Sequence, residues 1–237
     1  MENIVIFKSN DFKYPSQDER KEAIKGYPDL ECFDFEHKSG IKSILTDKMP
    51  LKEASRKENL FWWNSYLQNR LGSLQESYIY MITNYNRGFS DGYLKCHENE
   101  YINKFLFDYY AEIFYYYLFS TKDIIAQILN LYFSIDLDEE KVYVNKSFLE
   151  NISGKDKGLF KNFDKATEEA KKIRNSFAHR FSPNHPDYRL VYSIHNDSES
   201  VRIGGRIFTS SDKIVKNIND SLKKIQTLIL DLKKIMK

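Results

Sequence analysis

The chain has 237 residues, long enough for one domain with a sizeable core, and 15% of them are aromatic. Its formal net charge of +2 does not mark it as a nucleic-acid binder by overall charge alone. The two cysteines, Cys32 and Cys96, have no paired spacing, which argues against a disulfide framework. No apolar run approaches about 18 residues, which argues against a membrane span. Since the sequence also shows no recognisable signal peptide, we expect a cytoplasmic protein without membrane contact.

The first 50 residues form a segment of mixed composition. Prolines and glycines interrupt its short apolar groups, so we predict an irregular extension with one short helix near Gln17–Lys25. Its aromatic side chains indicate that this extension packs on the rest of the molecule. The predicted organisation is therefore an N-terminal extension over residues 1–50 and a helical domain over residues 51–237.

Two long helices follow the extension. Apolar residues step by threes and fours from Leu51 to about Tyr85, and Gly88 and Gly92 follow them. A second helical period runs from about Asn99 to Ser134. This helix also carries a polar stripe of Glu112, Tyr116, Ser120, Asp123, Gln127 and Asn130. A solvated face explains such a stripe, but serine, glutamine and asparagine also suit a pocket or a subunit contact.

The last hundred residues alternate between helix and hairpin patterns. We predict a loop over residues 135–160, with a short extended piece at Lys141–Asn145 and turns at Gly154 and Gly158. A third helix is expected from Phe160 to Ala178, a β-hairpin over about residues 188–208, and a last helix capped by residues 209–212. The predicted fold class is all-α, a four-to-five-helix up-down bundle with a small hairpin before the last helix.

The end of the third predicted helix carries the most informative motif, Arg174-Asn175-Ser176-Phe177-Ala178-His179. Five helical residues turn by about 500°, roughly 140° past a full rotation, so Arg174 and His179 share a face only if the helix ends or bends between them. Pro183 and the run that follows it predict such an ending.

These side chains suit the cleavage of RNA, whose 2′-hydroxyl lies next to each phosphate. Histidine moves protons near neutral pH, arginine binds the phosphate, and Asn175 can orient the imidazole or donate to the phosphate. However, an exposed arginine and a helix-ending histidine also occur on surfaces without any function.

The segment Lys155–Phe181 is locally basic, with eight basic and four acidic side chains and a net charge of +4. Lys171, Lys172 and Arg180 are therefore candidate contacts to a nucleic acid, although a charge run also suits a solvated face. His179, His185 and His195 lack the spacing of metal ligands, so we expect neither a metal nor another cofactor.

The hexapeptide Arg174–His179 resembles the Arg-x4-6-His signature of the HEPN superfamily, and residues 115–130 resemble the second core helix of a bacterial branch. This resemblance implies a metal-independent endoribonuclease that acts as a homodimer, with two Arg/His pairs facing each other across a cleft. It implies RNA as the substrate and a toxin–antitoxin, phage-defence or RNA-processing setting, with an antitoxin as a possible partner. Carried over by residue, Arg174 and His179 are catalytic, Asn175 is supporting, and Asp123 is the candidate for an extra acidic residue.

One position departs from a toxin branch of the family, which has a modifiable tyrosine two residues after the histidine. Phe181 stands there in this chain, so neutralisation through that hydroxyl is not expected. Two alternatives to a nuclease stay open: a non-catalytic HEPN module that binds nucleotide, RNA or protein, and an interaction protein whose aromatic stripes build an oligomer.

Overall fold

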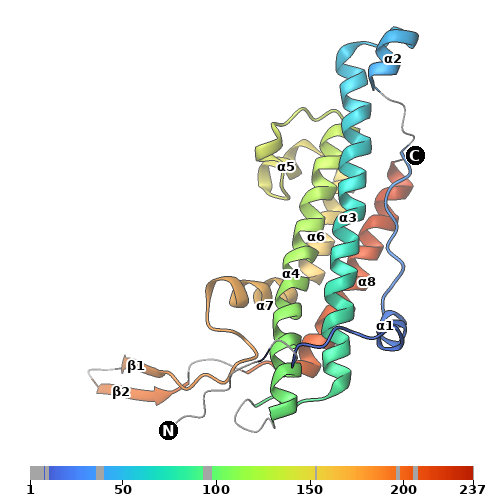
Figure 1. The fold of residues 1–237 in the computed structure, drawn as a ribbon. Helices are drawn as coiled ribbons and strands as arrows, with labels where there is room; N and C mark the ends of the chain where they lie inside the picture. Colours follow the sequence, from blue (N-terminus) through green and yellow to red (C-terminus); the bar gives the residue numbers. More distant parts are fainter. Residues whose placement is uncertain are drawn as a thin grey trace. The chain divides into compact units, whose positions relative to one another are not determined.

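The computed structural model describes residues 8, 11–35, 40–92, 98–152, 154–195, 198–204 and 208–236. Helices dominate these ranges, and one small antiparallel hairpin precedes the last helix (Figure 1), which confirms the predicted all-α class. The elements are α1 (Gln17–Ile24), α2 (Gly40–Asp47), α3 (Leu51–Arg87), α4 (Glu98–Tyr132), a 3-10 turn η3 (Glu139–Lys141), α5 (Lys146–Asn151), α6 (Gly154–Ala166), α7 (Glu168–His179), β1 (Leu190–His195), β2 (Ser198–Ile203) and α8 (Ser211–Ile235).

Contacts gather the chain into two compact units. The first unit comprises Met1–Tyr27, Ser77–Tyr115 and Glu169–Asp220, and the second comprises Pro28–Glu76, Tyr116–Glu168 and Ser221–Lys237. The three long helices α3, α4 and α8 each contribute one segment to either unit. Each unit therefore has a core of its own built from the same three helices.

Aromatic rings and their hydroxyl groups hold the first unit together. The rings of Tyr80 on α3 and Tyr110 on α4 lie 4.7 Å apart between centroids. The Tyr78 hydroxyl of α3 donates to Asn219 Oδ1 of α8 at 3.0 Å, and the Tyr115 hydroxyl of α4 donates to Asn217 Oδ1 at 2.8 Å. Buried tyrosines thus satisfy their polar ends between helices while their rings fill the core.

The short helix α1 is stabilised by a capping box at its first turn and by a contact with the end of α3. Ser16 and Glu19 form a capping box, in which each side chain bonds to the backbone N–H of the other residue. Arg87 at the end of α3 donates to both carboxylate oxygens of Glu19, at 2.8 and 3.0 Å. The helix expected near residues 17–25 is therefore present, and its acidic first turn attaches it to α3.

The second unit also holds part of the N-terminal segment. The Phe33 ring is buried at 4% exposure, and its backbone exchanges hydrogen bonds with the Asn64 side chain of α3 at 3.1 and 2.6 Å. Gln226 of α8 donates to the backbone oxygen of Asp29 at 2.9 Å. Residues 28–35 thus lie against α3 and α8, while the division of the chain at residue 50 stays a prediction.

The region between α4 and the hairpin differs from the prediction. Residues 135–160 contain η3, α5 and the start of α6, and the expected extended piece at residues 141–145 forms no strand. Gly154 begins α6 and Gly158 lies inside it, where burial of Phe160 and Phe163 outweighs the roughly 1 kcal/mol that a glycine in a helix interior costs. The single third helix is in fact two, α6 and α7, separated at the buried Thr167, whose hydroxyl donates to the Phe163 backbone oxygen at 2.8 Å.

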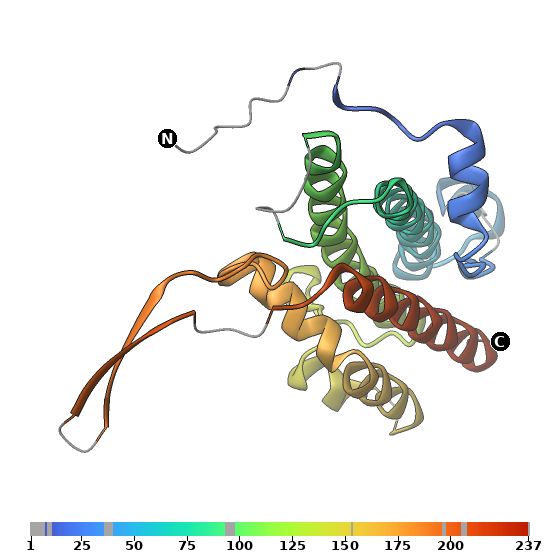
Figure 2. The same cartoon turned by 90° about the horizontal axis from the view of Figure 1, so that it is seen from below.

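The hairpin was predicted correctly in kind, and β1 pairs antiparallel with β2 from Leu190–Ile203 to His195–Ser198. Residues 205–207 of the expected second strand lie outside the described residues. Gly204 ends β2 at φ +73°, and a Cβ there would meet the Asp187 backbone oxygen at 2.6 Å. Figure 2 shows the hairpin extending away from α7 and from the start of α8.

Across the described ranges, no helix combines the length and apolar character needed to cross a membrane.

Candidate functional site

Helix α7 carries the predicted motif on a segment with one buried face. Ala170 and Ile173 are buried at 0% and 4% exposure, and the Phe177 ring lies 6.2 Å from the ring of Tyr115 on α4. Burial raises the pKa of Tyr115 well above its usual value, and the nearby Glu169 carboxylate adds to the effect. This tyrosine is therefore a neutral packing residue behind the motif.

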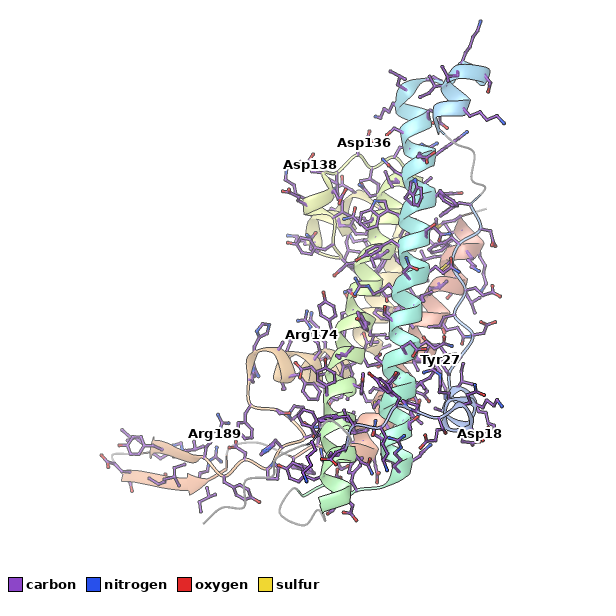
Figure 3. The ribbon with its side chains drawn as sticks, viewed as in Figure 1. Asp18, Tyr27, Asp136, Asp138, Arg174 and Arg189 are labelled. Carbon is purple, nitrogen blue, oxygen red and sulfur yellow. The ribbon has the colours of Figure 1, made fainter. Side chains whose placement is uncertain are left out.

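Arg174 and Asn175 are brought into direct contact. Arg174 Nη1 donates to Asn175 Oδ1 at 3.0 Å, and both side chains are half-buried. Figure 3 labels Arg174 on α7. The amide therefore acts on the arginine in this structure rather than on the imidazole. A guanidinium held by one neutral hydrogen bond keeps its charge and donors for an anion.

His179 is the last residue of α7, and its side chain is exposed. The helix does not end between Arg174 and His179, so the prediction of an ending there is wrong. It continues through His179, and the Arg180 backbone N–H donates to the Ser176 oxygen at 3.1 Å in the same helical pattern. Because the backbone stays helical, the two residues leave α7 in directions about 140° apart.

The basic candidates lie along α7 and directly after it. Lys171, Lys172 and Arg180 are all exposed, away from the buried Ala170 and Ile173. They are therefore accessible to a large anion such as a nucleic acid. Their role as RNA contacts stays a prediction.

Asp123 lies in the second unit, on the polar stripe of α4, and has a clear local role. Its Oδ1 accepts from the Val144 backbone N–H at 3.2 Å. Further along the stripe, Gln127 donates to the backbone oxygens of Glu139 and Val142 at 2.9 and 3.1 Å. Asn130 exchanges two hydrogen bonds with the Leu137 backbone at 2.9 and 3.1 Å. These three side chains hold the segment after α4. This role explains that part of the polar stripe, and it differs from the solvated face, pocket or subunit contact that the sequence suggested.

A buried network missed by the sequence reasoning anchors the loop after the motif. Lys104 on α4 has a fully buried side chain, and its Nζ lies 2.5 and 2.6 Å from the two carboxylate oxygens of Asp108. Asp108 also accepts from the amide of the buried Asn184, and the Ser182 hydroxyl donates to the Asn184 amide oxygen at 2.5 Å. The chain is thus fixed to α4 five residues after His179.

Phe181, which replaces the tyrosine of one toxin branch, packs inside this loop. The Arg189 guanidinium lies 4.4 Å from the centroid of its ring, and the His185 ring meets it edge-on at 5.6 Å. Figure 3 marks Arg189 beside the start of β1, where it also bonds to Asp187. Phe181 therefore links the end of α7 to the base of the hairpin.

Within the described residues, no group of three or more histidine, cysteine, aspartate or glutamate side chains could hold a metal ion. The arrangement at α7 offers instead a fixed cation, a titratable imidazole and accessible basic side chains. Acid–base and electrostatic chemistry are within reach of such groups.

The model of the Cthe2314-like HEPN family matches residues 63–237. This match covers all of α4, α7 and α8 and most of α3, together with the motif at Arg174–His179. No curated protein and no solved structure matches the chain.

Proposed function

The chain belongs to the Cthe2314-like HEPN family, and from this membership we propose that it is a metal-independent endoribonuclease. Membership indicates a nuclease or a nucleotide-binding module. We favour the nuclease because an arginine and a histidine lie on the same helix. Arg174 is half-buried and held by Asn175, and His179 is exposed. A binding module needs the cation but not an accessible imidazole on the same helix.

The proposed reaction uses the substrate's own nucleophile. His179 accepts the proton of the 2′-hydroxyl while the 2′-oxygen attacks the adjacent phosphorus, and the bond from phosphorus to the 5′-oxygen breaks. The leaving 5′-oxygen takes a proton from an imidazolium, and the products are a 2′,3′-cyclic phosphate and a 5′-hydroxyl. Arg174 binds the non-bridging oxygens, where negative charge grows in the transition state.

The directions of the two side chains support an active site shared by two copies of the chain. Arg174 and His179 leave a continuous helix about 140° apart, so one copy does not point both at one phosphate through its backbone alone. Two copies related by a twofold axis can supply the arginine and the histidine to one cleft from different chains. Lys171, Lys172 and Arg180 would line the approach for RNA.

The proposed biological setting is a toxin, defence or RNA-processing system in the cytoplasm, with an antitoxin or another neutralising protein as a possible partner. Phe181 carries no hydroxyl, so we propose no neutralisation by modification at that position. Asp123 enters the proposal only as a residue that shapes the second unit.

The decisive experiment measures cleavage of a mixed, structured RNA by purified protein in EDTA. His179→Ala and Arg174→Ala are expected to abolish cleavage with unchanged circular dichroism. His195→Ala is the matched control, because His195 is also exposed but lies in β1. Cleavage by His179→Ala would overturn the proposal, and RNA binding without cleavage by the natural chain would favour the non-catalytic module.

A further inference from the structure

The hairpin carries its apolar side chains on the outside. Leu190, Tyr192 and Ile194 alternate along β1, and the register places them opposite Ile203, Val201 and Glu199 of β2. Residues two apart on a strand share a face, so these six side chains form one surface of the hairpin, here called the apolar face. Its five large members are 54–72% exposed.

The opposite face of the same hairpin is polar. It presents Ser193, His195, Ser198, Ser200 and Arg202 together with Val191, and the hydroxyl oxygens of Ser193 and Ser200 lie 2.8 Å apart across the strands. Val191 and Ser193 are half-buried, whereas every residue of the apolar face is exposed. The amphipathic hairpin thus leaves its whole apolar face exposed to solvent, the reverse of what a lone chain favours.

A two-stranded hairpin with no packing partner is marginal in water. Exposed apolar patches larger than a few hundred square ångströms mark interaction sites. We therefore propose that the apolar face packs against the same face of a second copy of this chain, about a twofold axis. This interface goes beyond the proposed nuclease, because the exposure of the apolar face does not depend on whether the chain cleaves RNA.

The charge on the apolar face favours a second copy over RNA or an anionic lipid surface. Glu199 is its one ionisable acid and lies beside Tyr192, whose phenol pKa is raised by the hydrogen bond to that carboxylate. The face carries no lysine or arginine, so it offers nothing to a phosphate of RNA or of an anionic lipid. A nearly neutral apolar surface is complementary to itself.

The area of the apolar face suits the same partner. Five large side chains at these exposures present roughly 600 Å² per copy, so a symmetric pair would bury roughly 1,200 Å², the lower end of specific interfaces. Strands of six residues extend over about 20 Å, long enough to seat all five side chains on one partner. The buried loop around Asn184 and the bond from Gly204 N–H to the Arg189 oxygen give the arm a fixed base.

The test is the mass of the full chain in solution across a concentration series. The natural chain is expected to be a dimer, and Val201→Asp/Ile203→Asp is expected to raise the dimer dissociation constant at least about 100-fold, because burying these carboxylates has no compensation. Ser198→Asp/Ser200→Asp adds the same charge to the polar face and should leave the dimer intact. Leu190→Asp, on the other strand of the apolar face, should repeat the dissociation.

The proposal is overturned by a natural chain that stays monomeric, by apolar-face variants that dimerise normally, or by equal loss in the polar-face control. Binding of a monomer to lipid vesicles through this face would overturn it as well. His179→Ala separates the two proposals, because it should dimerise normally whatever happens to RNA cleavage.

Discussion

At the scale of single residues, a network of Lys104, Asp108 and Asn184 positions the loop that follows the motif. Lys104 is fully buried on α4 and is compensated by Asp108, which in turn holds Asn184 in the loop after α7. A buried ion pair contributes little compared with an apolar pair of the same shape, but removal of one partner leaves an uncompensated charge. This network therefore specifies where the loop after His179 lies.

We expect Asp108→Ala to lower the free energy of unfolding by about 3 kcal/mol, because the buried Lys104 ammonium loses both bonds to this carboxylate and Asn184 loses its acceptor. Urea denaturation followed by circular dichroism measures the loss. Asp138→Ala is the control, since Asp138 and Lys141 are 73% and 74% exposed and solvent screens their pair, so the loss should be much smaller. Equal losses in the two variants would show that the Asp108 network does not stabilise the fold.

The sequence pointed to Arg174, Asn175 and His179 because they lie within six residues and fit one chemistry. It did not reveal the network behind them, because Asp108 and Asn184 are 76 positions apart and a buried lysine has no local signature. It also did not reveal the direction of His179. Pro183 comes late enough for α7 to continue through the histidine, so the proline did not determine the geometry of the motif.

At the scale of elements, a charged contact between Glu19 and Arg87 joins α1 to the end of α3. The hydrogen bonds from Arg87 lower the pKa of Glu19 from 4.5 to about 2. Burial is the next largest effect and opposes this shift, while the bonds to Ser16 add to it. The folded chain therefore keeps this carboxylate ionised at a pH where the unfolded chain has bound a proton. The stabilisation is complete above about pH 4.5 and is lost as the pH falls towards about 2.

We expect Glu19→Gln to cost about 1 kcal/mol at neutral pH, a figure discounted for solvent because the Glu19 side chain is 35% exposed. The difference in unfolding free energy between the two proteins should shrink as the pH falls from 4.5 towards 2. Chemical denaturation of both proteins at a series of pH values measures this difference directly, and other acidic groups cancel in the comparison. A difference that stays constant over this range would contradict the assignment.

The polar stripe of α4 gives a second prediction at this scale. Asn130 is 6% exposed and makes two hydrogen bonds to Leu137, so Asn130→Ala should cost about 2 kcal/mol and speed hydrogen exchange at the Leu137 amide. Asn151→Ala removes one exposed bond inside α5 and should leave that amide unchanged. Unaltered exchange at Leu137 in the Asn130 variant would show that another contact holds this segment.

The long helices could be predicted from the sequence because their apolar residues repeat over 25 to 37 positions. The shorter elements could not. The apolar residues of α6 and α7 read as one stripe, since a break at one residue, Thr167, leaves the period almost unchanged. In α6 the two glycines suggested turns, and only the packing of Phe160 and Phe163 decides that they are helical.

At the scale of the whole molecule, the continuity of α7 bears on how the proposed active site is assembled from two copies. If the arginine and the histidine of one site came from the same copy, each copy would work alone, whatever its partner carried. The directions of Arg174 and His179 on a continuous helix favour a site with one residue from each copy. Mixed dimers of two inactive variants separate these arrangements.

We expect Arg174→Ala and His179→Ala to be inactive separately and to recover cleavage when the two proteins are unfolded, mixed and refolded together. Half of the dimers from equal amounts are mixed, and each has one complete site out of two, so about a quarter of the natural activity should return. A mixture of His179→Ala with the double variant Arg174→Ala/His179→Ala is the control, because no pairing of these chains supplies a histidine. Recovery in the first mixture alone supports a site built from two copies, whereas no recovery, in a mixture shown by mass to contain mixed dimers, would mean that each copy provides both residues.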